Sequence, residues 1–261
     1  MKAKKSLGQN FLIDNKIINN IIGSLDATKD DLIIEIGPGK GALTRLLKNK
    51  ESLLIAYEID QELMPILSKL EDDKTKIINK DILEVNLKKD LMNYKYNNLY
   101  IIGNLPYYIT TPIIKHLINQ NISIHSMIFM VQDEVADRFT AKPKTHDYGS
   151  ITLYLKYYFN IEKLFRVSKN AFNPVPKVES AVIKFTERFD KPQVDKEIYF
   201  KLISDAFSQK RKTLKNNLKD YDFNLIKNIL EINNLNELAR AEELNEEVFV
   251  AIATSLKNKQ I

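Results

Sequence analysis

The 261-residue chain contains no cysteine and has only three histidines and seven glycines. The lack of cysteine excludes disulfide scaffolds, zinc ribbons, iron–sulfur clusters and cysteine nucleophiles. Three histidines make a histidine-rich site improbable on numbers alone, so we expect no metal. The first residues carry charge but no apolar stretch of signal-peptide length, and no run approaches the ~20 apolar residues of a membrane span. We therefore expect a soluble, cytoplasmic protein with no membrane association.

Positive charge is present in excess and is unevenly distributed. The 39 basic residues outnumber the 34 acidic ones, which gives a net charge of +5 and a pI of about 9.0. Residues 201–219 alone hold six basic residues and one acid, whereas residues 231–247 are acidic. A local basic face favours nucleic-acid binding. An AT-rich genome would also enrich lysine, but it would not place the charge in one segment.

Hydrophobic patterning predicts an α/β fold. Hydrophobic residues make up 44% and charged residues 28% of the chain, as in ordinary globular proteins. Short apolar runs alternate with helical periodicities, which indicates a mostly parallel, doubly wound sheet. The expected strands are 32–36, 53–57, 76–78, 99–102, 127–131, 161–167 and 181–185. The expected helices are 16–25, 42–48, 61–70, 112–119, 134–139 and 150–158.

The pattern changes near residue 188. The last two expected strands have no helix between them, which predicts an antiparallel hairpin at the edge of the sheet. A polar stretch with a proline follows, and residues 196–257 show only helical periodicities. We therefore expect an α/β domain over residues 1–188 and a small all-helical domain over residues 189–261.

Three of the few glycines lie in one loop directly after the first expected strand of the sheet, at Gly37, Gly39 and Gly41. Glycine permits tight turns and lets a ligand approach the backbone closely. The spacing of Gly37, Gly39 and Ala42 also satisfies the dinucleotide-binding fingerprint. Glu35 separates the two interpretations, because a carboxylate there would repel a pyrophosphate and suits a cationic ligand. The loop resembles the S-adenosylmethionine (SAM) motif of Rossmann-like methyltransferases.

Two acids follow the next strands. Glu58 ends the second expected strand of the sheet, where an acid typically binds ribose hydroxyls, and Asp81 follows the third. Ligands of such sheets collect at the carboxyl ends of the strands. Both acids therefore support a nucleoside ligand, and we expect the Glu58 carboxylate to be exposed when none is bound.

The sharpest motif is Asn104-Leu105-Pro106-Tyr107, after the fourth expected strand. It resembles the motif of methyltransferases that act on amino groups. The Asn104 side-chain oxygen and the Leu105 carbonyl can accept the two N–H groups of an adenine amine and stabilise the charge that develops on nitrogen. Pro106 fixes the turn, and Tyr107 offers a ring on which a flipped-out base can stack.

Eight segments together resemble a known family over nearly the whole chain. They are GQNFL, EIGPGKGALT, YEID, NKDIL, GNLPYYITTPI, MVQDEVADR, FNPVPKVESAV and AFSQKRKTLKNNL. In order and approximate spacing they resemble the ribosomal small-subunit adenine dimethyltransferases, the KsgA family. The resemblance implies a Rossmann-like SAM-dependent enzyme that dimethylates N6 of two adjacent adenines near the 3′ end of small-subunit rRNA. It also implies a role in the maturation of that subunit.

The resemblance implies site residues by motif. Tyr107 and Phe172 would sandwich the target base, beside the catalytic residues Asn104, Leu105 and Pro106. SAM would contact Asn10, Leu12, Gly37, Gly39, Glu58, Ile59, Asp81, Ile82 and Asn104. From the distribution of charge, we expect the RNA of a pre-ribosomal particle to contact a basic helical stretch of Lys210, Arg211, Lys212, Lys215 and Lys219, joined by Lys2, Lys4 and Lys5. The family commonly has two arginines where this chain has Lys210-Arg211, and lysine lacks the planar fork of arginine.

Three alternatives use part of the same pattern. Antibiotic-resistance methyltransferases, which act on a single adenine of large-subunit rRNA, share the glycine loop and the Asn-x-Pro-Tyr motif, but AFSQKRK and RAEEL favour the small-subunit branch. An NAD-dependent oxidoreductase would leave the Asn104 motif and the basic segment unused. A non-enzymatic RNA-binding assembly factor would leave the Asn104 motif unused. We expect the enzyme to be a monomer.

Overall fold

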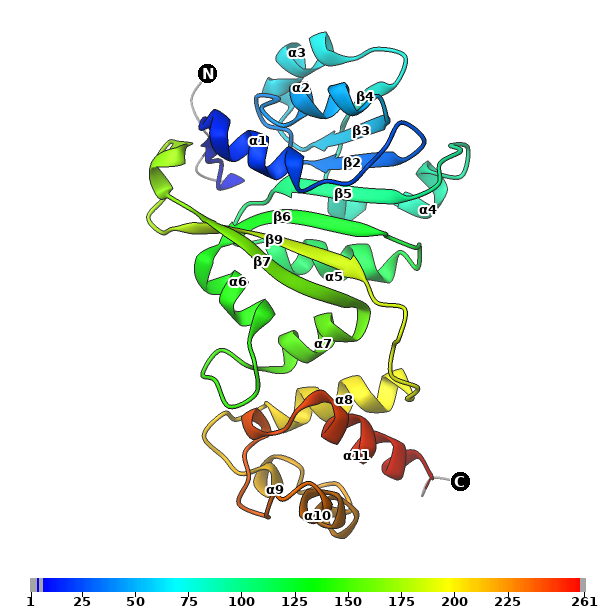
Figure 1. The fold of residues 1–261 in the computed structure, drawn as a ribbon, viewed down its shortest axis with the longest axis vertical. Helices are drawn as coiled ribbons and strands as arrows, with labels where there is room; N and C mark the ends of the chain where they lie inside the picture. Colours follow the sequence, from blue (N-terminus) through cyan, green and yellow to red (C-terminus); the bar gives the residue numbers. More distant parts are fainter. Residues whose placement is uncertain (1–3, 5–6, 259–261) are drawn as a thin grey trace. The chain divides into compact units, whose positions relative to one another are not determined.

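A computed structural model describes residue 4 and residues 7–258, and the chain forms two compact units (Figure 1). The first unit contains the residues up to 136 together with 162–187, and the second contains 137–161 together with the residues from 188 onward. The chain thus passes into the helical unit twice. The expected boundary at residue 188 matches the second entry into the helical unit but misses the first. The sequence pattern did not show that residues 137–161 pack with the C-terminal helices.

The first unit is built on a seven-stranded sheet with the order β4-β3-β2-β5-β6-β9-β7. The pairs β3–β4, β2–β3, β2–β5 and β5–β6 are parallel, and β9 runs antiparallel to β6. The antiparallel addition at this edge confirms the expected departure from a parallel sheet. The strands are β2 (Leu32–Ile36), β3 (Leu53–Glu58), β4 (Thr75–Asn79), β5 (Leu99–Asn104), β6 (Ser126–Gln132), β7 (Phe159–Val167) and β9 (Ser180–Glu187).

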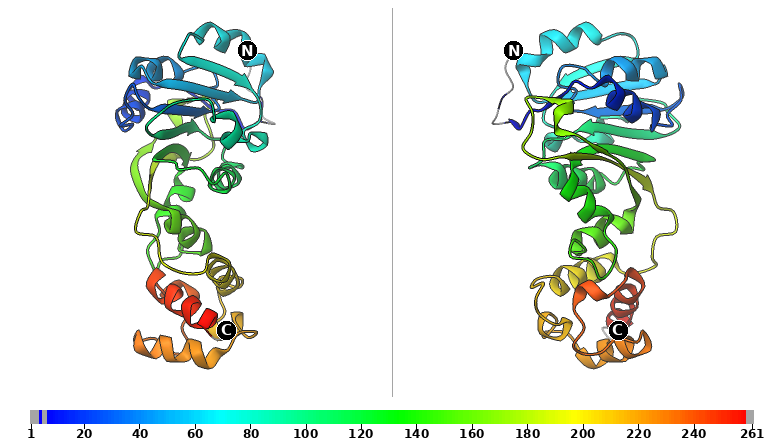
Figure 2. Two further views of the ribbon diagram at one scale, coloured as in Figure 1. Left: turned by 90° about the vertical axis from the view of Figure 1, so that its right-hand side faces the viewer. Right: turned by 60° about the vertical axis from the view of Figure 1, so that its left-hand side comes forward.

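The central strands are apolar on both faces because helices cover both. Leu32, Ile33 and Ile34 are successive residues of β2, and none is accessible to solvent. Such continuous apolar runs are typical of buried parallel strands. Figures 1 and 2 show α1 on one face of the sheet and α5 on the other. The helices of this unit are α1 (Asn15–Gly23), α2 (Thr44–Leu47), α3 (Met64–Leu67), α4 (Leu87–Asp90) and α5 (Thr110–Asn119), followed by α6 (Asp133–Thr140) at the passage to the second unit.

The expected helix over residues 61–70 forms only in pieces. A 3-10 turn, η3 (Gln61–Leu63), precedes α3, and a second, η4 (Ser68–Leu70), follows it. Pro65 lies at the start of α3. Proline donates no backbone hydrogen bond and favours the first turn of a helix, so a new helix begins there rather than one continuing through.

A separate two-stranded sheet joins two distant motifs. β1 (Phe11–Leu12) pairs antiparallel with β8 (Phe172–Asn173), so that Leu12 lies opposite Phe172. The Ile13 N–H also donates to the Ala171 carbonyl oxygen at 2.9 Å. The GQNFL and FNPVP motifs, which lie far apart in the sequence, are therefore neighbours in the fold.

The second unit is helical and has its own core. Leu202, Leu230 and Phe249 are fully buried there, on three different helices. The Arg188 Nη1 atom bonds both carboxylate oxygens of Glu246 at 2.8 Å and stabilises the same unit. Its helices are α7 (Ser150–Tyr158), α8 (Lys196–Ala206), α9 (Leu214–Asn217), α10 (Phe223–Ile232) and α11 (Glu246–Asn258).

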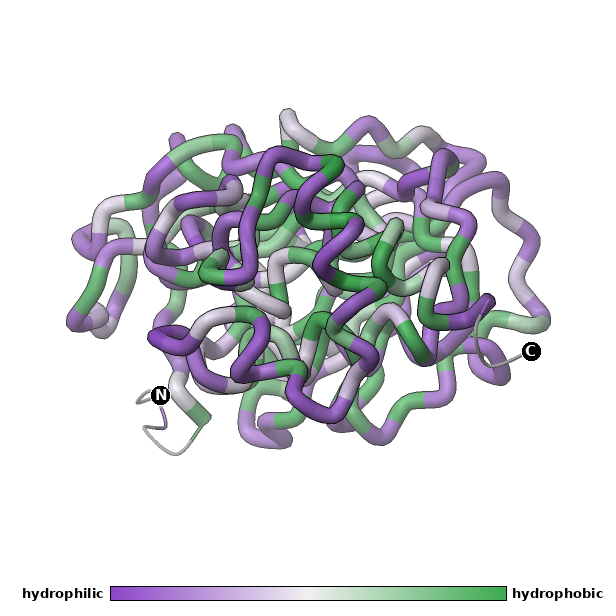
Figure 3. Tube along the Cα trace, turned by 90° about the horizontal axis from the view of Figure 1, so that it is seen from below, coloured by the Kyte–Doolittle hydropathy of each residue, from purple (hydrophilic) through white to green (hydrophobic). Residues whose placement is uncertain are grey.

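Within the described part of the chain, no helix is both long enough and apolar enough to span a bilayer. Hydrophobic and hydrophilic residues alternate over short distances along the trace in Figure 3. No group of three or more metal-ligating His, Asp or Glu side chains was found among the same residues.

Candidate active site

A cavity of about 720 Å³ opens at the carboxyl ends of β2, β3, β4 and β5. This volume lies within the usual range for small-molecule sites, ~300–1,000 Å³. The strand order turns back between β2 and β5, and ligands of open α/β sheets bind at that point. Of the residues predicted from the sequence, the lining contains Asn10, Leu12, Gly37, Gly39, Glu58, Ile59, Asp81, Ile82, Asn104, Leu105, Pro106 and Tyr107.

The glycine loop has the backbone shape that only glycine adopts easily. Gly37 and Gly39 have φ values of +68° and +60°, in the left-handed region that disfavours side chains. A Cβ atom on Gly39 would lie 3.1 Å from the Phe11 ring, whereas one on Gly37 would meet nothing nearer than 4.0 Å. Gly37 therefore leaves open space above the sheet where a ligand can lie close to the backbone.

Glu58 is buried, with only 4% of its surface exposed, so the expectation that it would be exposed is wrong. Its Oε2 atom accepts the Gly39 N–H at 3.0 Å, and its Oε1 atom accepts the Asp60 N–H at 2.9 Å. Burial raises the pKa of Glu58, although these two hydrogen bonds oppose the rise. Each carboxylate oxygen has a second lone pair, which leaves Glu58 able to accept ribose hydroxyls.

The other cofactor-site predictions on β3 and β4 are close by. Asp81 caps the 3-10 turn η5 (Ile82–Glu84) by accepting the Leu83 N–H at 2.9 Å. Ile59 is 51% exposed, which is unusual for isoleucine, while Ile82 is 5% exposed. Both isoleucines line the cavity beside the two acids. Ile59 and Ile82 can therefore contact the faces of a flat ring, and the Asp81 carboxylate can bind a polar group at its edge.

Glu35 is the most deeply buried acid of the cavity, at 1% exposure. Burial raises its pKa to about 7, although hydrogen bonding to the neighbouring Thr44 opposes the rise. Its Oε2 atom has no hydrogen-bond partner among the described residues. A buried polar atom without a partner costs free energy, and such atoms point to an unfilled ligand site or a neutral carboxyl.

The Asn104-Leu105-Pro106-Tyr107 motif lies at the end of β5 and on the loop that follows it. The Asn104 Nδ2 group donates to the Asn10 carbonyl oxygen at 2.9 Å, which leaves Oδ1 to accept. Leu105 is buried, and its N–H donates to the Met130 carbonyl oxygen at 3.3 Å. These two anchors hold the motif between β5 and β6, facing the cavity.

Tyr107 and Tyr108 both line the cavity. The Tyr107 hydroxyl bonds the Ser180 Oγ atom at 2.7 Å, and burial raises its pKa. Tyr108 is 63% exposed and lies beside Gly8, whose added Cβ would be 3.2 Å from the Tyr108 ring. Sequence reasoning did not select Tyr108, although its position directly after the motif was a usable signal.

Phe172 does not lie in the cavity. Its ring is 1% exposed and packs in the core with Leu12, Ile18 and Val167. The β1–β8 pairing directs it inward, so the ring offers no open face for a base. The expected sandwich of Tyr107 and Phe172 is therefore not present in this structure, and Asn173 lines the cavity instead.

The basic stretch lies in the second unit and differs from the expected helix. Lys210, Arg211 and Lys212 form an exposed turn between α8 and α9, which we call the basic turn. The Lys210 Nζ group donates to the His146 carbonyl oxygen at 3.0 Å. Lys215 forms an ion pair with Glu237 at 2.7 Å, whereas Lys219 is exposed. Among the described residues, no ion pair engages Arg211, Lys212 or Lys219.

Of the three amino-terminal lysines expected to join the basic stretch, the structure describes Lys4. Lys4 forms ion pairs with Asp60 at 2.6 Å and with Glu62 at 3.0 Å. Lys2 and Lys5 lie outside the described residues. Lys4 is thus occupied by carboxylates rather than available to phosphate.

Comparison with known proteins agrees with the geometry. The model of the ribosomal RNA adenine dimethylase family matches residues 1–258. Ribosomal RNA small subunit methyltransferase A of Alkaliphilus oremlandii is 40% identical, with 99% of this chain and 93% of the relative covered. The protein of that name from Geobacillus thermodenitrificans is 43% identical over 82% of this chain and 75% of its own.

Two solved structures share the fold. A dimethyladenosine transferase from Plasmodium falciparum superposes with a TM-score of 0.80 at 23% identity, covering 96% of this chain and 98% of the other. The 23S rRNA methyltransferase ErmE gives 0.73 at 24% identity, covering 95% and 100%. At these identities the likeness establishes the Rossmann-like methyltransferase fold with its helical appendage.

Proposed function

The chain belongs to the ribosomal RNA adenine dimethylase family, and we propose that it dimethylates N6 of two adjacent adenines near the 3′ end of small-subunit rRNA. SAM is the methyl donor. The observation that carries this proposal is the Asn104 motif at the mouth of the cavity, with one amide oxygen free to accept. The small-subunit substrate rests on the names of the relatives.

The side chains and open space of the cavity fit the parts of SAM. The unpartnered Glu35 Oε2 atom suits the ammonium group of an amino acid, and Gly37 leaves room for the chain of that amino acid. Glu58 suits ribose hydroxyls, and Asp81 suits the adenine amine. SAM, when bound, supplies an electrophilic methyl group on its sulfonium.

The chain's residues make the adenine amine reactive. An exocyclic amine is a poor nucleophile because its lone pair is delocalised into the ring. Asn104 Oδ1 and the Leu105 carbonyl accept its two N–H bonds, which favours a tetrahedral nitrogen and stabilises the positive charge that develops there. Tyr107, on the same loop, gives the extruded base a ring to stack on.

Specificity must extend beyond the cavity, since many adenines would fit it. We propose that the domains divide this work: the first unit binds SAM, and the helical unit docks on folded rRNA through phosphate contacts. The basic turn and Lys219 supply the free positive charge. We further propose that the substrate is a pre-ribosomal particle, that the enzyme works in the cytoplasm and that it acts as a monomer.

Methyl transfer to ribosomal subunits tests the proposal. The chain is incubated with methyl-labelled SAM and with unmodified small or large subunits, and label in the RNA is counted. We expect incorporation into the small subunit. Incorporation into the large subunit alone would instead identify an enzyme of the resistance type.

A further inference from the structure

The segment of residues 7–12, here called the N-terminal segment, forms one wall of the cavity. All six of its residues line the cavity. Its far end is held by the pairing of β1 with β8. Its near end is anchored by side-chain hydrogen bonds instead, beginning with that of Gln9.

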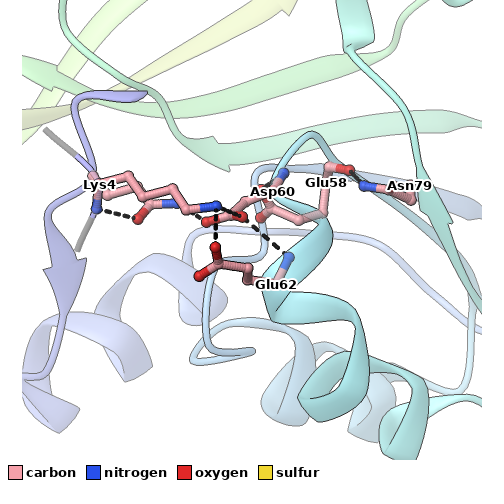
Figure 4. Close-up of polar contacts among 6 residues, drawn as sticks. Lys4, Glu58, Asp60, Glu62 and Asn79 are labelled. Carbon is pink, nitrogen blue, oxygen red and sulfur yellow. Dashed lines mark hydrogen bonds and ion pairs between the residues drawn. The ribbon is translucent and has the colours of Figure 1, made fainter. Parts of the chain in front are cut away.

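That anchor is Asp60, as Figure 4 shows in part. Its Oδ1 atom accepts Lys4 Nζ at 2.6 Å, and its Oδ2 atom accepts Gln9 Nε2 at 2.7 Å. Lys4 and Gln9 are also joined to each other, because the Lys4 N–H donates to Gln9 Oε1 at 2.8 Å. One carboxylate oxygen therefore holds Gln9 of the N-terminal segment directly, and the other holds Lys4, which is itself bonded to Gln9.

The Asp60 side chain is only 3% exposed, whereas that of Lys4 is 34% exposed. Burial alone would raise the pKa of Asp60, but the hydrogen bonds from Lys4 and Gln9 outweigh it and lower the pKa. Exposed ion pairs contribute little to stability, but a buried carboxylate depends on its donors. Removing them would leave an uncompensated charge.

Asp60 is connected to both halves of the active site. Its N–H donates to Glu58 Oε1 at 2.9 Å, next to the proposed ribose contact (Figure 4). Through the N-terminal segment it reaches the catalytic loop, where Asn10 accepts the Asn104 amide and Gly8 packs beside Tyr108. The segment thus links the cofactor side of the cavity to the side of the target base.

We propose that Asp60 is a positioning residue that latches the N-terminal segment over the cavity and thereby orients the Asn104 amide toward the target amine. This rests on the proposed function for the identity of that amine. With the segment latched, the Asn10 carbonyl engages Nδ2 and Oδ1 faces the substrate. Without the latch, the amide loses its partner and the wall of the SAM site opens.

Asp60→Asn tests the latch. Asparagine keeps an acceptor for the cap of η3, where Asp60 accepts the Glu62 N–H at 3.1 Å, but it loses the ion pair with Lys4. We expect SAM affinity, measured by calorimetry, to fall roughly tenfold, the lower end for losing a hydrogen bond to a charged group. Hydrogen exchange of residues 7–12 should quicken, and kcat at saturating SAM should fall as well.

Three further variants complete the test. Lys4→Met should reproduce the Asp60→Asn effects, and Lys4→Arg should restore SAM affinity. Asp72→Asn is the control, because Asp72 forms an ion pair with Lys48 at 2.8 Å that does not involve the N-terminal segment. If Asp60→Asn and Lys4→Met both bind SAM with wild-type affinity and show wild-type hydrogen exchange of residues 7–12, Asp60 does not position the N-terminal segment.

SAM binding and the hydrogen exchange of residues 7–12 can both be measured without RNA. A wild-type chain that failed to methylate adenine would overturn the proposed function. SAM affinity and hydrogen exchange would still show whether Asp60 holds the N-terminal segment. In the converse outcome, the wild type methylates normally while Asp60→Asn keeps the wild-type SAM affinity, hydrogen exchange and kcat. That result would overturn the role proposed for Asp60 and leave the proposed function standing.

Discussion

The Asn104 side-chain amide donates to the Asn10 backbone carbonyl oxygen at 2.9 Å, across 94 residues of sequence. An amide has one donor group and one acceptor, so engaging Nδ2 fixes where Oδ1 points. In the proposed function, the contact therefore orients the Asn104 acceptor before substrate arrives. Preorganisation of this kind stabilises developing charge without reorganisation during the reaction.

Replacing Asn104 should therefore remove catalysis more than folding. Asn104→Ala should lower the rate of methyl transfer by about 10²–10³, by analogy with the loss of one oxyanion-hole donor. Single-turnover assays with small-subunit particles measure the effect. Asn119→Ala, on the exposed end of α5, serves as the control. Full activity of the Asn104 variant would remove this residue from the mechanism.

The aromatic residues should separate into two classes. Phe172→Ala should destabilise the fold by about 3–5 kcal/mol, as expected for a fully buried ring. Tyr107→Ala should instead weaken RNA methylation, with stacking worth ~1–3 kcal/mol, and Tyr107→Phe should retain most activity. Urea unfolding and methylation assays distinguish them. A Phe172→Ala variant as stable as the wild type but inactive would restore the expected stacking role of Phe172.

The buried Glu35 should make stability depend on pH. Its folded pKa of about 7 lies above the ordinary value of 4.5 for a glutamate, so the unfolded state loses its proton first as the pH rises. Stability should fall between about pH 4.5 and 7 and level off above, by at most about 3 kcal/mol at 1.36 kcal/mol per unit. Glu35→Gln cannot ionise, so its urea midpoint should fall less over pH 5–7. Parallel curves for the two proteins would contradict this account.

The basic turn should contribute salt-dependent binding. Lys210, Arg211 and Lys212 replaced together by alanine should weaken binding to small-subunit particles. The slope of log K against log salt should flatten by about 1 for each lost phosphate contact. Lys201→Ala is the control, since Lys201 lies outside the predicted RNA contacts and forms an ion pair with Asp205 at 2.6 Å. Equal slopes for the triple variant and the wild type would exclude the basic turn from docking.

Sequence patterning predicted the sheet well because most of its strands are short apolar runs bounded by turn residues. It could not predict β1 and β8, since two-residue strands carry no periodicity and their pairing depends on residues 160 positions apart. The helix over 61–70 was expected as one element, but Pro65 divides it.

Site residues were predictable where a motif fixes the backbone, as at Gly37 and Asn104. Burial was not predictable in the same way, because the sequence does not say which way a side chain at the end of a strand turns. Phe172 faces the core and Glu58 is enclosed by backbone donors. Asp60 was overlooked although it lies two residues after Glu58, since its partners, Lys4 and Gln9, are remote in sequence.

The most direct test of the account is the identity of the methylated nucleoside. Small-subunit rRNA from unmodified particles is treated with the chain and SAM, digested, and analysed by mass spectrometry. The account predicts N6,N6-dimethyladenosine at two adjacent positions in the 3′-terminal fragment, and its loss with Asn104→Ala. Methylation of another base, of ribose, or of no nucleoside at all would contradict it.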